Sequence, residues 1–140
     1  MRLPRWIYPP TRRRSRSTWY EVGYEGQWAG HRDGAFQLTR EDFLSCIEAL
    51  DSQVNPVSSD YEHLSMDPPP EGAPASVWTQ KLQIRGKSLW AFGEFTPRAA
   101  AYIRGGEYKY SSGVFAHSWP DRVTGKPRRC VLRSVALTND

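Results

Sequence analysis

Cysteine and long apolar runs are scarce in this sequence, and both scarcities exclude classes of protein. The 140 residues include only two cysteines, Cys46 and Cys130, which lie far apart and in no CxxC pattern. Reduced thiols are therefore expected, not a disulfide framework. No apolar run approaches the ~20 residues of a membrane-spanning helix, and no apolar stretch follows the first arginines as in a secretory signal. The sequence predicts no membrane partner.

Acidic residues are missing from the first seventeen positions, and this locates the positive charge. The net charge of +4 by itself favours a nucleic-acid or anionic partner. However, residues 1–17 carry six arginines and no acid, whereas residues 18–140 carry thirteen basic and fifteen acidic side chains. We predict a disordered, arginine-rich arm over 1–17, with weak contact to nucleic acid or an acidic protein, and one folded domain over 18–140.

Aromatic residues are abundant, and they favour a folded core. They make up 13% of the chain, with six Trp and seven Tyr, and aromatic side chains drive burial. Short aromatic and β-branched segments bounded by Gly, Pro and Asn predict strands. The expected strands cover 19–24, 35–38, 57–63, 77–84, 88–95, 107–117 and 129–138.

Two segments carry the signals of helix ends. Thr39, followed three residues later by Asp42, predicts a capped helix that ends near Gln53. Thr96-Pro97 predicts the start of a second helix, which Gly105-Gly106 end. Few strands are joined by helical crossovers, so we expect an α+β domain. Its sheet should be curved and mostly antiparallel, or a partial barrel, with two helices.

Histidine is scarce enough for each one to be tested as an acid, a base or a ligand. Of His31, His63 and His117, the strongest candidate is His63, because it ends the ionisable segment DYEH. In an extended strand Asp60 and His63 lie on opposite faces, so neither neighbouring acid orients the ring unless the strand bends. No metal site is predicted, because the chain has no HExxH and no paired CxxC.

Two adjacent serines are candidate nucleophiles. Ser111 and Ser112 should point to opposite faces of a strand, one into the protein and one toward a cleft. Gly113 follows them, and its accessible backbone N–H would suit an oxyanion hole. The alternative reading is that these small residues only pack within a crowded aromatic sheet. Cys46 is expected to be a buried helix thiol.

Several separate segments together resemble the Mu-like phage I protein family. They are DYEH at 60–63, TPRAA at 96–100, GEYKYSSGVF at 106–115, TG at 124–125 and SVALTN at 134–139. Members are head-maturation proteases of tailed phages and look related to the herpesvirus assemblin type of serine protease. The resemblance implies an assemblin-like fold with Ser112 as nucleophile and His63 as base. It places the third member near Thr138 or Asn139, with Asp60 and His117 as weaker choices.

The resemblance also implies partners and a location. The substrates would be phage scaffold and major capsid protein, cut inside the procapsid in the bacterial host cytoplasm, without a cofactor; a homo-oligomer is compatible with this role. The loop over 65–76, with four prolines, would act as a lid or rim. The alternative is a catalytically inactive capsid-assembly factor of the same fold. Many members continue past SVALTN into a helical scaffolding region, so we expect that scaffold either to be a separate chain or to be absent.

Overall fold

Strands dominate the chain, and two helices interrupt them. The computed structural model describes residues 2–6, 17–31, 34–53 and 55–139. Within these residues the helices are α1 (Arg40–Asp51), α2 (Pro97–Arg104) and a short 3₁₀ helix, η1 (Leu64–Met66). The strands are β1 (Arg2–Trp6), β2 (Ser17–Tyr24), β3 (Gly26–Trp28), β4 (Phe36–Leu38), β5 (Val57–Tyr61), β6 (Val77–Arg85), β7 (Ser88–Phe95), β8 (Tyr110–Pro120) and β9 (Pro127–Thr138).

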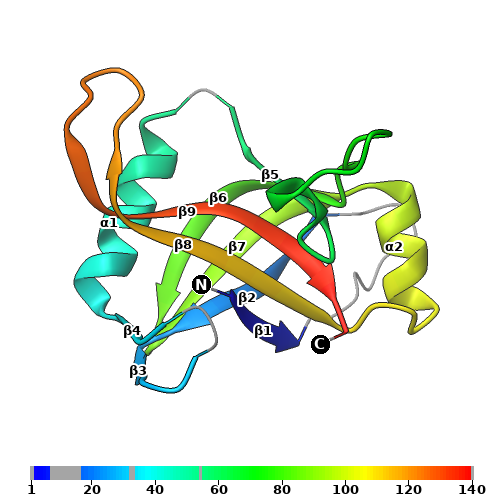
Figure 1. Ribbon diagram of the computed structural model, residues 1–140. Coiled ribbons are helices and arrows are strands. Elements are labelled where there is room, and N and C mark those ends of the chain that lie inside the picture. Colours follow the sequence, from blue (N-terminus) through cyan, green and yellow to red (C-terminus); the bar gives the residue numbers. More distant parts are fainter. Residues whose placement is uncertain (1, 7–16, 32–33, 54, 140) are drawn as a thin grey trace.

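Seven of these described strands form one curled sheet, in the order β1-β8-β9-β5-β6-β7-β2. Neighbouring strands are antiparallel except β5 and β9, which run parallel. The sheet curls so far that β2, at one end of the order, packs against β1 and β8 (Figure 1). β3 and β4 form a separate two-stranded sheet. The predicted α+β class, with a curved, mostly antiparallel sheet and two helices, is confirmed.

The amino-terminal segment corrects one expectation. Residues 2–6 form β1, which pairs antiparallel with β8 along its whole length. The prediction of a disordered arm over 1–17 is therefore wrong for residues 2–6, and Ser17 already begins β2; residues 7–16 lie outside the described residues. The physical reason is the edge of β8, whose backbone N–H and C=O groups pair with an added strand even when that strand lacks an apolar pattern.

Helix α1 begins as the sequence predicts. Thr39 Oγ1 accepts a hydrogen bond from Asp42 N (3.2 Å), and Asp42 Oδ2 accepts one from Thr39 N (2.9 Å). The two residues thus satisfy each other in a capping box. The helix packs against β9 and β6 and buries Phe43 and Cys46 there. The expectation of a buried Cys46 thiol is confirmed.

Helix α2 lies at the opposite end of the sheet from α1 (Figure 1). Thr96 Oγ1 accepts a hydrogen bond from Ala99 N (3.2 Å), and Pro97 occupies the first helical position, where its missing N–H costs nothing. The Tyr102 ring of α2 meets the Tyr61 ring of β5 edge-on, with centroids 5.8 Å apart. Among the described residues no helix is both long enough and apolar enough to cross a membrane.

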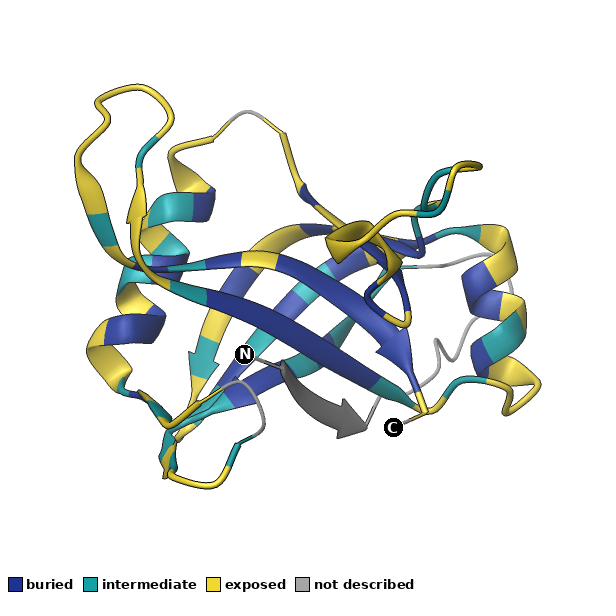
Figure 2. Cartoon of the chain, viewed as in Figure 1, coloured by how far each residue is buried: buried dark blue, intermediate teal, exposed yellow. Residues whose placement is uncertain are grey.

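The apolar core lies inside the curl of the sheet, where the buried residues gather (Figure 2). Tyr20 of β2 and Phe95 of β7 are fully buried and meet edge to face, with ring centroids 5.4 Å apart. β8 and β2 also approach closely. A Cβ added at Gly113 would lie 2.8 Å from the Val22 carbonyl oxygen, so the two strands can pack this tightly only because position 113 is glycine.

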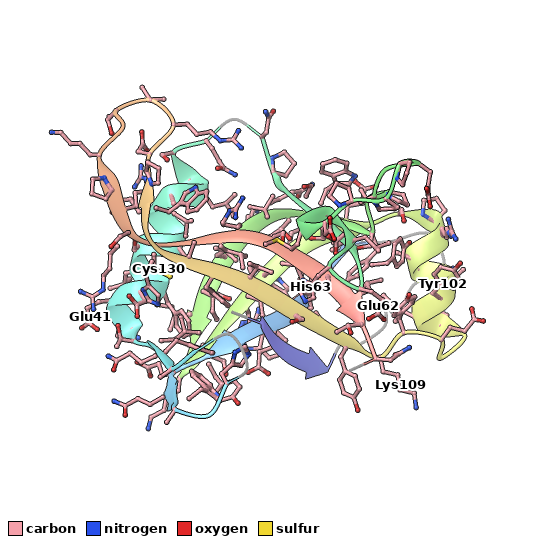
Figure 3. The ribbon with its side chains drawn as sticks, viewed as in Figure 1. Glu41, Glu62, His63, Tyr102, Lys109 and Cys130 are labelled. Carbon is pink, nitrogen blue, oxygen red and sulfur yellow. The ribbon has the colours of Figure 1, made fainter. Side chains whose placement is uncertain are left out.

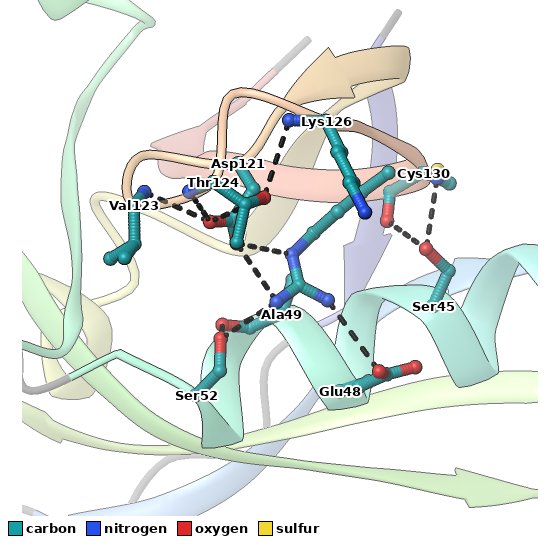
Figure 4. A network of polar contacts seen from close by, with 10 residues as sticks. Ser45, Glu48, Ala49, Ser52, Asp121, Val123, Thr124, Lys126 and Cys130 are labelled. Carbon is teal, nitrogen blue, oxygen red and sulfur yellow. Dashed lines mark hydrogen bonds and ion pairs between the residues drawn. The ribbon is translucent and has the colours of Figure 1, made fainter.

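The hairpin between β8 and β9 is closed by one carboxylate, Asp121. Its Oδ1 accepts hydrogen bonds from Val123 N (2.9 Å) and Thr124 N (2.8 Å), and its Oδ2 accepts one from Arg128 Nε (2.9 Å). Arg128 Nη2 also donates to Ser52 Oγ at the end of α1 (3.1 Å). These contacts join the hairpin turn to α1 (Figure 4). The backbone N–H of Thr124, that of Val123 and the Arg128 side chain lower the pKa of Asp121 to about 2.

Removing the Asp121 carboxylate is expected to loosen this turn. A carboxyl group with a lowered pKa stabilises the fold fully above its usual pKa near 4, and this contribution is lost as the pH falls toward 2. In Asp121→Ala, amide exchange at Val123 and Thr124, measured by NMR, should be faster than in the wild type at pH 6. Glu71→Ala, which removes an exposed acid elsewhere, is the control. Unchanged exchange at both amides would contradict the expectation.

Candidate active site

The chain bends sharply where it leaves β5, and His63 lies in this bend. β5 ends at Tyr61, and the next two residues take left-handed backbone angles, with φ of 53° at Glu62 and 58° at His63. Glu62 N still donates to Leu137 O of β9 (2.9 Å). The expected strand end at His63 is therefore wrong by two residues. Because the chain bends here, a neighbouring acid can lie beside the His63 ring, which an extended strand would not allow.

Three strands bring Ser112 and Asp60 into one row. Ser112 of β8 lies opposite Ala136 of β9, and Ala136 lies opposite Asp60 of β5. Residues opposite one another share a face of the sheet. Neighbouring strands lie about 4.8 Å apart, so the Cα atoms of Ser112 and Asp60 are separated by about 10 Å. The next row, which includes Leu137 and Tyr61, faces the apolar core. Ser112 and Asp60 therefore lie on the other side, which we call the outer face.

The two adjacent serines have different surroundings. Ser111 Oγ donates to Glu21 O of β2 (2.7 Å), inside the curl, whereas Ser112 lies on the outer face. The predicted opposite orientation is confirmed. The predicted exposure to a cleft is not, because Ser112 is only 2% exposed. The outer face is covered in this region, and Figure 1 shows the segment after β5 crossing the carboxyl-terminal half of β9.

Asp60 anchors the covering segment to the outer face. Its Oδ2 accepts hydrogen bonds from both the backbone N (2.8 Å) and the hydroxyl of Ser65. Its Oδ1 is buried and accepts no hydrogen bond from any described residue. The same holds for Ser134 Oγ, two residues before Ala136 on the same strand. Buried oxygens without partners are rare, and each one calls for an explanation.

The two residues predicted as third members of the site have different partners. Thr138 Oγ1 donates to Glu62 Oε2 (3.1 Å) and so ties the end of β9 to the residue before His63; Glu62 and His63 are labelled in Figure 3. Asn139 instead fixes the connection into β8. Its Oδ1 accepts from Lys109 N (3.1 Å), and its Nδ2 donates to Glu107 O (2.7 Å). Thr138 therefore borders the histidine bend, while the Asn139 amide is used elsewhere.

The structure also shows the surroundings of two other candidate residues, His117 and Gly113. His117 lies five residues beyond Ser112 on the same strand, about 16 Å away at the usual rise per residue, and its ring contacts Asp42 of α1 instead. It is wrong as a member of a Ser112 site. Gly113 is paired on both edges, with Leu3 of β1 and Val135 of β9. Backbone amides in a ladder are normally used by that ladder, so its oxyanion role stays a prediction.

The structure is an α+β domain with a curled sheet, in which the side chains of Ser112, Asp60 and His63 are all buried. The family model for the Mu-like prophage I protein, N-terminal domain, matches residues 23–140. The chain therefore belongs to the Mu-like prophage I protein family, and its role is phage-related. No curated protein and no solved structure matches the chain. The assemblin-like fold thus stays a prediction.

Proposed function

We propose that this chain is a serine endopeptidase of phage head maturation that cuts scaffold or major capsid protein. The main supporting observation is that Ser112 of β8 and Asp60 of β5 lie in one row of the outer face, and that the bend with His63 directly follows β5. The buried, unpartnered Asp60 oxygen supports the proposal, because a catalytic histidine needs a hydrogen-bond acceptor behind it. Membership of a prophage family supports the substrate class.

The proposed reaction is acyl transfer. Ser112 Oγ attacks the carbonyl carbon of the scissile peptide bond while His63 accepts the hydroxyl proton. The bond to nitrogen then breaks, and His63 gives that proton to the leaving amine. Water then attacks the acyl carbon while His63 accepts its proton, and the ester bond breaks as His63 returns that proton to Ser112 Oγ. Asp60, with one oxygen to spare, would orient the imidazole and stabilise it when it is charged.

Access to this site requires motion. Both Ser112 and His63 are buried, at 2% and 8% exposure. His63 lies within the segment that begins at Glu62, and this segment is held beside Asp60 by the Ser65 bonds. We propose that the segment from Glu62 through the proline-rich loop acts as a lid that opens for an extended peptide. Such a device would confine cleavage to the procapsid, where scaffold and capsid segments are concentrated.

The second candidate is a capsid-assembly factor without enzymatic activity. One observation favours it: Ser112 is covered, so the resting fold offers no open cleft at the serine. The factor would bind scaffold or capsid protein without cutting it. Because both candidates share partners and fold, only a measurement of cleavage separates them.

Substitution of the proposed base provides that measurement. The full chain is co-expressed with the scaffold and capsid proteins of the same phage, and the products are identified by intact mass. We expect His63→Gln to slow processing at least about a thousandfold, because the serine then lacks a base. His31→Gln, which alters a histidine outside this region, should process normally. If His63→Gln cleaves at the wild-type rate, or the wild type never cleaves, the proposal is overturned.

A further inference from the structure

A second group of reactive side chains lies at the α1 end of the molecule, away from Ser112. Asp42, His117 and Cys130 each offer one ligand atom, and these three atoms lie within 4.8 Å of one another. The Cys46 thiol joins them: its hydrogen bond with the Cys130 side chain, together with burial, raises the pKa of Cys46. Two thiols, one imidazole and one carboxylate therefore gather at one point.

The local structure explains why these four residues converge. Asp42 and Cys46 are four residues apart on α1, so they lie on one face of the helix. His117 and Cys130 lie directly opposite each other on β8 and β9, so they share a face of the hairpin. Since α1 packs against β9, the two ligands on the helix lie against the two ligands on the hairpin. Four ligands from three elements can then surround one small volume.

We propose that Asp42, Cys46, His117 and Cys130 form a zinc site. Zinc prefers four ligands in a tetrahedron, and thiolate sulfur, imidazole nitrogen and carboxylate oxygen are its usual protein ligands. Metal–ligand bonds of about 2.0–2.3 Å place such ligands about 3.5 Å apart. The present spacing therefore has to shrink by about 1 Å. The His117 side chain is 40% exposed, so it is free to rotate inward.

The surrounding contacts are compatible with a metal. Asp42 Oδ2 is used by the helix cap, whereas Oδ1 accepts a hydrogen bond from Arg129 Nε (2.9 Å) and lies 3.7 Å from His117 Nδ1. The Arg129 side chain is 58% exposed, so it can move into solvent when a metal takes Oδ1. Binding releases the protons of the two thiols, which makes it stronger at higher pH.

A second layer already holds one ligand in place. Ser45, next to Cys46 on α1, donates from Oγ to Cys130 O (2.8 Å) and accepts from Cys130 N (3.0 Å), as Figure 4 shows. Outer contacts of this kind orient metal ligands and are part of a working site. A bound zinc ion would fasten α1 to the hairpin and so stabilise that end of the curled sheet.

Metal titration of the full chain tests the proposal. The reduced, metal-free protein is titrated with Zn²⁺ alone, and with Co²⁺ as a spectroscopic probe. One ion per chain should bind, with a thiolate-to-cobalt absorption band and a higher Tm. His117→Asn and Cys130→Ser should each weaken Zn²⁺ binding by more than about a hundredfold, since even the loss of an outer contact costs 10–100-fold. His31→Asn should bind normally.

Two further results sharpen the test. Arg129→Gln should tighten Zn²⁺ binding, because it removes the cation that competes for Asp42. His117→Asn changes an exposed side chain, so it remains informative if Cys130→Ser fails to fold. The proposal is overturned if the wild type shows no cobalt–thiolate band. It is equally overturned if His117→Asn binds Zn²⁺ as tightly as the wild type does.

Discussion

Ser112→Ala is expected to abolish processing of co-expressed scaffold and capsid protein while the domain stays folded. The variant keeps the backbone of β8 and removes the only proposed nucleophile. Loss of the nucleophilic serine in a serine protease lowers kcat by about a millionfold. The measurement is the fraction of precursor converted over time, read by intact mass, with far-UV circular dichroism to verify the fold.

The neighbouring serine provides the matched control. Ser111 is also fully buried, but its hydroxyl bonds to Glu21 O inside the curl. Ser111→Ala should therefore cost about 1 kcal/mol of stability from the lost hydrogen bond and leave the processing rate unchanged. Persistent cleavage by Ser112→Ala would contradict the assignment of the nucleophile. So would an equal loss of cleavage in a well-folded Ser111→Ala.

Gly113→Ala is expected to cause a large loss of stability from a single added methyl group. The new Cβ would lie 2.8 Å from the Val22 carbonyl oxygen and 2.9 Å from the Phe115 ring. The ring can turn, but the carbonyl belongs to the backbone of β2 and cannot move without disturbing the sheet. Overpacking of this kind costs up to about 3 kcal/mol, which lowers the Tm of a chain this size by about 10 °C. Thermal unfolding measures it.

Gly30→Ala is the control for this prediction. A Cβ at Gly30 would meet no atom within 4 Å, so its free energy of unfolding should change by less than about 0.5 kcal/mol. If Gly113→Ala unfolds at the same temperature as the wild type, β2 and β8 are not packed as tightly as described. The reading of Gly113 as a packing residue would then fail.

Local signals predict most of the fold, because they act over a few residues. The Thr39 and Thr96 caps mark both helix starts, since a side-chain oxygen there satisfies free N–H groups. The hairpin of β6 and β7 follows from the Arg85-Gly86-Lys87 turn. β1 was missed for the opposite reason. Its pairing depends on the edge of β8, a partner more than a hundred residues away, and its own pattern carries no strand signal.

The candidate site is predictable only in part. The period of two along a strand places Ser111 and Ser112 on opposite faces, as observed. The parallel pairing of β5 with β9, which brings Asp60 into the Ser112 row, is set by the whole sheet. The bend at His63 has no local signal, because left-handed backbone angles are uncommon for residues other than glycine. The sequence did not reveal the proposed zinc ligands either, because they are brought together by the pairing of β8 with β9 and the packing of α1 on β9, which depend on the whole fold.

The position of β9 has a consequence for synthesis. This strand, Pro127–Thr138, is the last described in the chain, yet it lies between β8 and β5 in the middle of the sheet. The ribosome must therefore release almost the entire domain before β5 and β8 are joined. Long-range pairing of this kind is slow to form. The serine and histidine regions therefore come together only after translation of β9.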